Sequence, residues 1–285
     1  MKIAQIQMHV TPDKTENLRR AAALLEQAGP TDMAVLPEMF CCPYDNSCFR
    51  AYGEAPGGEA YQFLSALARE KRLWLVGGSV PELSDGKVYN TSYVFDPSGR
   101  CAARHRKLHL FDIDVPGGQS FRESATLSPG SEVTVFDTPW GRMGLCICFD
   151  FRFPELAHLM ALSGAKILLV PAAFNMTTGP AHWELLFRQR AVDTQCFTVG
   201  TSPPAMRPPP TWPGDTPSSA TPGARCSTPA AMGRRCPSPS WICPVWTPSA
   251  GSSLCSPPAA PMSTPSAPST MRDRRYVLPV MLSLF

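Results

Sequence analysis

The chain has 285 residues, 44% of them hydrophobic, which is enough to bury the core of one large domain or of two small ones. Its uninterrupted apolar runs are too short for a membrane span, and residues 1–10 contain Gln5, Gln7 and His9 and no cleavage-site pattern, so we expect neither a membrane partner nor secretion. The net charge of +3 does not indicate a nucleic-acid partner, because residues 1–202 carry 19 Lys and Arg against 21 Asp and Glu (net −2), whereas residues 203–285 carry 7 against 2 (net +5).

Predicted strands and helices alternate along residues 1–202. In chain order, the sequence predicts a strand at 3–10, a helix at 13–28, a strand at 34–36, a helix at 59–70, strands at 74–77, 92–95, 133–136 and 141–147, a helix at 154–163, a strand at 167–170, a helix at 182–194 and a strand at 196–200. Such alternation is typical of an α/β domain built in layers.

Cys148 stands where an apolar strand is followed by a helical pattern that opens with Arg152 and Pro154. At such a junction we expect the helix N-terminus to lower the pKa of the thiol, and free backbone N–H groups could face an oxyanion. The alternative is a buried cysteine that acts as a small hydrophobic residue, and taken alone it is the commoner case.

Three other segments could supply a base and a cation to this thiol. Glu38 follows the strand at 34–36, Lys107 lies in a mostly apolar loop, and Glu123 is a second carboxylate. Each also has a plain alternative: Glu38 as a solvated or capping acid, Lys107 as one cation of a basic patch, and Glu123 as a surface charge. Their combination with Cys148 favours a catalytic site over four unrelated residues.

The same four positions lie in motifs that resemble one family. The motifs are Leu36-Pro37-Glu38, Arg106-Lys107-Leu108-His109-Leu110-Phe111-Asp112, the run from Gly144 to Glu155, and the run from Asn175 to Glu184. They resemble the nitrilase, or carbon-nitrogen hydrolase, superfamily, and the segments 107–117 and 177–186 are similar to its omega-amidase branch. The resemblance extends from Lys2 to about Ser202. It implies an α/β fold, the four-layer α-β-β-α sandwich of the nitrilase type.

The resemblance also implies a mechanism. Cys148 would attack an amide carbon, Glu38 would act first as base and then as acid, and the Lys107 ammonium with the backbone N–H of Phe149 would hold the oxyanion. Glu123 would support the site by orienting Lys107 and the substrate amide. No cofactor is implied.

The omega-amidase branch implies a small-molecule amide substrate, namely the terminal amide of α-ketoglutaramate or α-ketosuccinamate. Arg152 would bind the distal carboxylate, which a planar guanidinium suits. The resemblance implies a homodimer in the intact family form. Two alternatives stay open: another amidase, carbamoylase or nitrile hydrolase of the superfamily, and an inactive or partner-dependent product.

Seven cysteines precede residue 203, mostly in apolar contexts, and indicate a reducing compartment; we expect a cytoplasmic protein, with mitochondrial presence left open.

Neither a second nucleophile nor a metal site is expected beside Cys148. In the family, the position of Cys146 usually holds a small residue. Cys146 lies on the strand two residues before Cys148, and we expect its side chain to contribute to packing. The Cys-x-Cys spacing differs from that of zinc or redox motifs. His105 and His109 could share a helix face, but no third ligand is apparent.

The composition changes abruptly after Ser202. Residues 203–270 hold 18 of the 32 prolines and no histidine, lysine or glutamate, which predicts a disordered tail in place of the C-terminal strands, so that the hydrolase domain, 1–202, would be truncated. Residues 271–285 form a short segment of unknown role. Codons for 210–216, read from the third base of the Pro210 codon, permit Tyr-Val-Ala-Trp-Gly-His, which resembles the next core strand of the family. We interpret the tail as a frame-shifted translation that begins between Ser202 and Arg207; the translation in the other frame is called the shifted reading below. A genuine Pro/Ser-rich interaction tail is the alternative.

Overall fold

A computed structural model describes residues 1–115, 119–175, 178–204, 225–227 and 240–244. Most of the strands form two sheets. The first sheet has the strand order β14-β1-β2-β3-β5-β4, with β6 also paired to β5. Its strands are β1 (Lys2–Ile6), β2 (Met33–Val35), β3 (Trp74–Val76), β4 (Val80–Ser84), β5 (Lys87–Phe95), β6 (Cys101–Arg106) and β14 (Ser240–Pro244).

The second sheet has the order β13-β12-β11-β10-β9, and a separate two-stranded ribbon joins β7 to β8. The sheet consists of β9 (Thr134–Thr138), β10 (Gly141–Leu145), β11 (Ile167–Pro171), β12 (Phe197–Thr201) and β13 (Arg225–Ser227); the ribbon strands are β7 (Asp112–Asp114) and β8 (Ser120–Arg122). Strands β10, β11 and β12 run parallel, so their carboxyl ends meet at one edge of the sheet.

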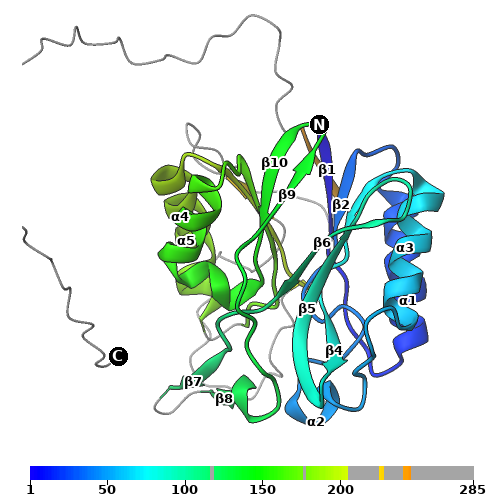
Figure 1. Cartoon of the computed structure of the whole chain (residues 1–285), viewed down its shortest axis with the longest axis vertical. Coiled ribbons are helices and arrows are strands. Elements are labelled where there is room, and N and C mark those ends of the chain that lie inside the picture. The colour runs from blue at the N-terminus through cyan, green and yellow to red at the C-terminus, as the bar shows by residue number, and fades with distance from the viewer. Residues whose placement is uncertain (116–118, 176–177, 205–224, 228–239, 245–285) are drawn as a thin grey trace, which may run out of the picture. The chain divides into compact units, whose positions relative to one another are not determined.

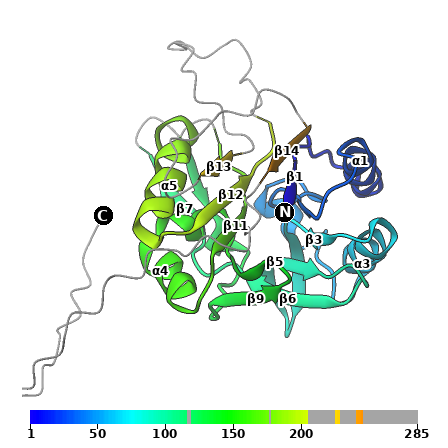
Figure 2. The same cartoon turned by 90° about the horizontal axis from the view of Figure 1, so that it is seen from above.

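Helices cover the outer face of each sheet (Figures 1 and 2). Helices α1 (Lys14–Gln27) and α3 (Glu59–Lys71) lie against the first sheet, and α4 (Pro154–Leu162) and α5 (Gly179–Thr194) lie against the second. The remaining helices are short: α2 (Asn46–Phe49), η1 (Glu123–Ala125) and η2 (Cys148–Arg152). This is the layered α/β domain that the sequence predicted, in the four-layer α-β-β-α arrangement that the resemblance to the nitrilase superfamily implied.

Three apolar cores separate these layers, as the alternation of side chains along the strands requires. In β2, Met33 and Val35 face the second sheet, whereas Ala34 faces α1 and α3. The core between the sheets is completed by Leu145 and Leu169 of the second sheet. Each sheet is therefore apolar on both faces, which favours two buried sheets over one solvent-facing sheet.

The four predicted helices and the eight predicted strands are all present, with ends shifted by a few residues. The helix predicted at 13–28 is α1, and the Asp13 side chain caps it by accepting from the backbone N–H of Glu16 at 3.1 Å. The ribbon strands β7 and β8 were not predicted. Strands β4 and β6 were not predicted either. They flank β5 as antiparallel partners, and β6 leads directly into the segment that carries Lys107.

Two short strands lie in the segment that was expected to hold none. Strand β13 pairs antiparallel with β12, and β14 pairs antiparallel with β1, so each lies at the end of a sheet's strand order. The structure differs from the prediction at these two places. The rest of the predicted tail, and the segment 271–285, lie outside the described residues.

Candidate active site

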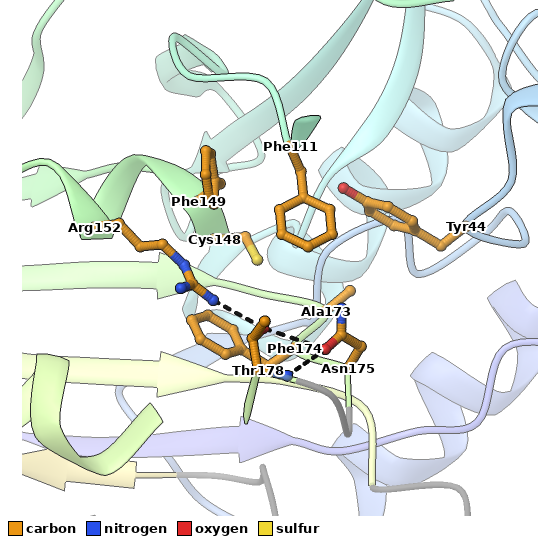
Figure 3. Close-up of a pocket in the computed structure, with 9 residues that line it drawn as sticks. All are labelled: Tyr44, Phe111, Cys148, Phe149, Arg152, Ala173, Phe174, Asn175 and Thr178. Carbon is orange, nitrogen blue, oxygen red and sulfur yellow. Dashed lines mark hydrogen bonds between the residues drawn. The ribbon is translucent and has the colours of Figure 1, made fainter. Parts of the chain in front are cut away.

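Cys148 occupies a strained turn at the carboxyl end of β10. Its φ of +45° lies in the left-handed region, which is uncommon for a residue with a side chain and costs conformational energy. The turn directs the sulfur into a pocket between the two sheet systems (Figure 3). The pocket is lined by Tyr44, Phe111, Cys148, Phe149, Arg152, Ala173, Phe174, Asn175 and Thr178. Cys148 is only 7% exposed, but it lines this pocket, as a merely structural cysteine need not.

Glu38 reaches the same place from the end of β2. Its backbone N–H donates to the carbonyl of Ala172, beyond β11, at 3.2 Å, so the Glu38 turn is anchored to the second sheet. Oε1 accepts from Asn90 Nδ2 at 2.8 Å and from Lys107 Nζ at 2.8 Å. Oε2 is buried without an ordinary hydrogen-bond partner among the described residues, and the carboxylate interacts with the Cys148 thiol. Glu38 is thus placed to take a proton from that thiol.

Lys107 is fully buried between two carboxylates. Its Nζ lies 2.8 Å from Glu38 Oε1 and 3.0 Å from Glu123 Oε2, and it donates to Tyr44 Oη at 3.2 Å. Glu123 is itself fixed, because Tyr44 Oη and the backbone N–H of Phe111 donate to it at 2.9 Å and 2.6 Å. The side chains of Glu38, Lys107 and Glu123 are all inaccessible to solvent, so none of the three is a solvated surface charge.

Burial controls the proton affinities in this cluster. It raises the pKa of Glu38, against the opposing effect of Lys107, and it raises the pKa of Cys148 well above its usual range, with Glu38 adding to the rise. Burial alone would lower the pKa of Lys107, but Glu123 and Glu38 raise it well above its ordinary value. The expectation that the helix N-terminus lowers the thiol pKa is wrong, because desolvation is the larger effect. The thiol stays protonated at rest and needs a neighbouring base.

Cys146 lies in the core between the second sheet and its helices. It is completely buried, its backbone N–H donates to Leu169 O at 3.2 Å, and it does not line the pocket. The prediction that it contributes to packing therefore agrees with its place in the structure.

Arg152 lies on the wall of the pocket, at the end of η2. One guanidinium nitrogen contacts His182 Nδ1, and the other donates to Thr178 Oγ1 at 2.9 Å, as Figure 3 shows for Thr178. Its Nε is buried without a partner among the described residues. Burial lowers the pKa of Arg152, and burial and the nearby guanidinium lower the pKa of His182. A cation whose hydration is this incomplete gains from an anionic ligand.

Sequence reasoning missed three residues of the site: Asp150 and Asn90, which are buried, and Tyr44, which is partly buried. Asn90 Nδ2 bridges the two carboxylates, at 2.8 Å from Glu38 and 3.2 Å from Glu123. Asp150 stands two residues after Cys148, within the same motif, and this spacing was the one available signal for it. Nothing in the local pattern around Asn90 or Tyr44 marks them, because their contacts are far apart in the sequence.

His105 and His109 do not form a metal site with a third ligand in the part of the chain that the structure describes. Both rings instead face the carboxylate of Asp150, at 2.9 Å each. Among the described helices, none is long and apolar enough to cross a membrane.

The fold and the buried cluster correspond to one class of protein. The chain belongs to the carbon-nitrogen hydrolase family, which matches residues 2–221. Among curated proteins it is 50% identical over 204 residues to an omega-amidase of Mus musculus and 48% identical over 204 residues to that of Homo sapiens; each match covers 71% of this chain and 74% of the relative. It is 49% identical over 206 residues to a hydrolase of Schizosaccharomyces pombe, of which it spans 64%.

Solved structures are similar as well. A Saccharomyces cerevisiae member of branch 10 of the nitrilase superfamily aligns with a TM-score of 0.68 and 39% identity, covering 82% of this chain and 84% of that one. The Caenorhabditis elegans NitFhit protein aligns with a TM-score of 0.68 and 32% identity, covering 81% of this chain and 56% of that one. The layered fold is therefore that of the nitrilase superfamily.

Proposed function

We propose that this protein hydrolyses linear amides through a thioester on Cys148. The observation that carries the proposal is the buried cluster in which the Cys148 thiol, at the wall of a pocket, lies beside the Glu38 carboxylate and the Lys107 ammonium. Glu38 accepts the thiol proton as sulfur attacks the amide carbon, and the carbonyl electrons move to oxygen. The oxyanion is stabilised by the Lys107 ammonium and the backbone N–H of Phe149, in the first turn of η2, where N–H groups lack partners within the helix.

The second half of the cycle uses the same carboxyl group. Glu38, now protonated, gives its proton to the departing nitrogen as the C–N bond breaks, so ammonia leaves and the thioester remains. Glu38 then takes a proton from water, whose oxygen attacks the thioester carbon, and returns that proton to sulfur as the C–S bond breaks. The raised pKa of Glu38 suits both roles, because a carboxyl group that binds a proton readily is a better base and still serves as an acid.

The substrate class that we propose is the terminal amide of a small dicarboxylate, such as α-ketoglutaramate or α-ketosuccinamate. Two observations support it: the identity of about half the matched residues to omega-amidases, and the Arg152 guanidinium on the pocket wall beside the apolar rings of Phe149 and Phe174. Arg152 would bind the carboxylate at the far end of the substrate while Cys148 engages the amide.

An assay panel tests both parts of the proposal, the hydrolysis of linear amides and the substrate class. Ammonia release is measured from α-ketoglutaramate, from an N-carbamoyl amino acid and from an aliphatic nitrile, with the 285-residue chain and with the chain that carries the shifted reading. We expect turnover of the keto acid amide, and we expect Arg152→Met to raise its KM while leaving that of an uncharged amide unchanged. Preference for the carbamoyl compound or the nitrile would move the protein to another branch of the superfamily.

We also propose a cytoplasmic homodimer. The support for assembly is a set of exposed apolar side chains on the outer helices of the second sheet, of which Leu162 and Leu185 are 84% and 60% exposed. Light scattering during gel filtration measures the mass, and fractionation of cells measures the location. A monomer, or a membrane-enclosed compartment, would contradict these parts of the proposal.

A further inference from the structure

The carboxylate of Asp150 is the acceptor for five polar groups, although it is completely inaccessible to solvent. Oδ1 accepts from the backbone N–H groups of Leu108 and His109, at 3.0 and 2.8 Å, and faces His109 Nδ1 at 2.9 Å. Oδ2 accepts from the backbone N–H of Ile147 at 3.0 Å and faces His105 Nε2 at 2.9 Å. An ionised carboxylate only accepts, so the two ring nitrogens that face it carry protons.

These partners come from the two segments that bring the catalytic groups together. Ile147 precedes the nucleophile, and Asp150 follows it within η2, so the carboxylate closes the turn that holds Cys148 at positive φ. His105 is in β6 of the other sheet, and Leu108 and His109 directly follow Lys107. One side chain is thus bonded to His105 before Lys107, to Leu108 and His109 after it, and to the residue before Cys148.

We propose that Asp150 is a positioning residue, whose carboxylate sets the separation between the Lys107 ammonium and the Cys148 sulfur. The inference rests on the roles given to Cys148 and Lys107 under the proposed function. Asp150 itself does not line the pocket, so it acts through the two groups that it holds. A displacement of about 1 Å between catalytic groups costs about a hundredfold in rate, which makes such a shared anchor effective.

Ionisation of Asp150 is consistent with this role. Burial alone would raise its pKa, but hydrogen bonds from His105 and His109, with that from the Ile147 backbone, hold the pKa well below its ordinary value. The carboxylate therefore keeps all its acceptor capacity at neutral pH. An amide in its place would turn one acceptor into a donor that faces other donors.

The test compares Asp150→Asn with a matched control, Asp137→Asn. Asp137 lies on β9, is exposed, and forms an ion pair with Arg142. It lies in neither of the two segments that carry Lys107 and Cys148. His109→Phe serves as a milder variant, because a phenyl ring can keep the stacking on Phe153, now at a centroid distance of 3.8 Å, while it removes one donor to Asp150. Melting temperatures, kcat and KM for α-ketoglutaramate are measured for the parent and these variants, each in the 285-residue chain and in the chain with the shifted reading.

The decisive readout is the rate at which iodoacetamide alkylates Cys148, followed by peptide mass spectrometry. Alkylation needs the thiol to meet its base but needs no turnover, so it reports on the site even in a slow preparation. We expect Asp150→Asn to lower the alkylation rate and kcat by about tenfold to a hundredfold with KM within about threefold, and His109→Phe to lower both several-fold at an unchanged melting temperature. Asp137→Asn should change neither.

Alkylation and kcat at control values in folded Asp150→Asn, or in His109→Phe if the first variant does not fold, would overturn the inference. So would losses that are matched by Asp137→Asn. Failure of the proposed function has a different signature, because Cys148→Ala would then retain hydrolysis. A dead Cys148→Ala beside an unimpaired Asp150→Asn would remove this inference alone.

Discussion

At the scale of single residues, Cys148 and Cys146 lie two positions apart and only Cys148 lines the pocket. Cys148→Ala should abolish ammonia release from α-ketoglutaramate, because no other pocket residue supplies a thiol. Cys146→Ala should leave kcat within about twofold and cost roughly 1 kcal/mol of stability as a buried side chain is shortened. Ammonia assays and thermal melts of both variants, in the chain with the shifted reading, check this. An active Cys148→Ala beside a dead Cys146→Ala would reverse the assignment.

Lys107 combines a catalytic and a structural role, so its removal should affect two measurements. Lys107→Met deletes the oxyanion donor and should lower kcat at least roughly a hundredfold, with a modest change in KM. It also leaves Glu38 and Glu123 buried together without a cation, which should cost about 3–5 kcal/mol of stability. Kinetics and urea denaturation separate the two effects. A near-normal kcat would reduce Lys107 to a structural cation.

The identities of Glu38, Lys107, Glu123 and Cys148 could be found from the sequence, because each lies in a motif that resembles the family. Their burial could not, because it depends on how the two sheets pack. The thiol pKa illustrates this: the strand-to-helix junction alone indicates a lowered value, whereas the packed site raises it. Asp150 was overlooked for the same reason, since its partners become neighbours only when β6 and η2 meet.

At the scale of elements, the turn that presents Glu38 depends on close contact with the turn after β3. Gly78 has a φ of +59°, and a Cβ there would lie 2.1 Å from the carbonyl oxygen of Pro37, next to Glu38. Gly86 also has a positive φ, +74°, but a Cβ there would meet nothing within 4 Å. Substitutions at both glycines strain the backbone, but only a substitution at Gly78 also displaces the turn that carries Glu38. Comparing the two therefore distinguishes these effects.

Gly86→Ala should lower stability by about 1–2 kcal/mol, the usual cost of left-handed backbone for a residue with a Cβ. Gly78→Ala should cost at least as much, because its Cβ also meets the backbone of Pro37. Only Gly78→Ala should also lower kcat, because the Pro37 carbonyl has to move and Glu38 moves with it. Thermal melts and steady-state kinetics of the pair test this. Equal activities of the two variants would show that the Glu38 turn tolerates the shift.

Element prediction succeeded where apolar spacing was strong and failed where it was weak. The helix predicted at 13–28 is α1, whose amphipathic pattern buries Leu18, Ala21 and Leu25. Strand β6 was missed because only one of its six residues, His105, is buried, so no apolar alternation marks Cys101–Arg106, and its strand conformation comes from pairing with β5. Because β6 leads into Lys107, the sequence could indicate the lysine but not the strand that positions it.

At the scale of the whole molecule, each sheet ends on a short strand from the region after residue 204. Strand β13 pairs with three residues of β12, and β14 pairs with all five of β1. The match to the Mus musculus omega-amidase covers only 74% of that relative, so part of the relative has no counterpart in the matched segment of this chain. The apolar faces of the two sheets still have to be covered over their full area.

The final prediction is that the 285-residue chain is a poor enzyme although its catalytic cluster is complete. Residues 203–270 hold 18 prolines, about one in four, which prevents a continuous ladder of strand hydrogen bonds. Several hundred Å² of apolar surface left in water would forfeit on the order of 10 kcal/mol at about 25 cal/mol per Å², comparable to the stability of a whole domain. The shifted reading supplies a strand-like segment, Tyr-Val-Ala-Trp-Gly-His, from the codons of residues 210–216, a short distance after the resemblance ends at about Ser202. We therefore expect the 285-residue chain to aggregate or to need a partner, and the chain with the shifted reading from Ser202 to be soluble, oligomeric and active.

Soluble yield, cooperativity of melting and α-ketoglutaramate hydrolysis are compared for the two chains. A 285-residue chain that is monomeric, melts cooperatively and turns over at the same rate would show that β13 and β14 suffice to complete the sheets, and the frame-shift interpretation would lose its functional consequence.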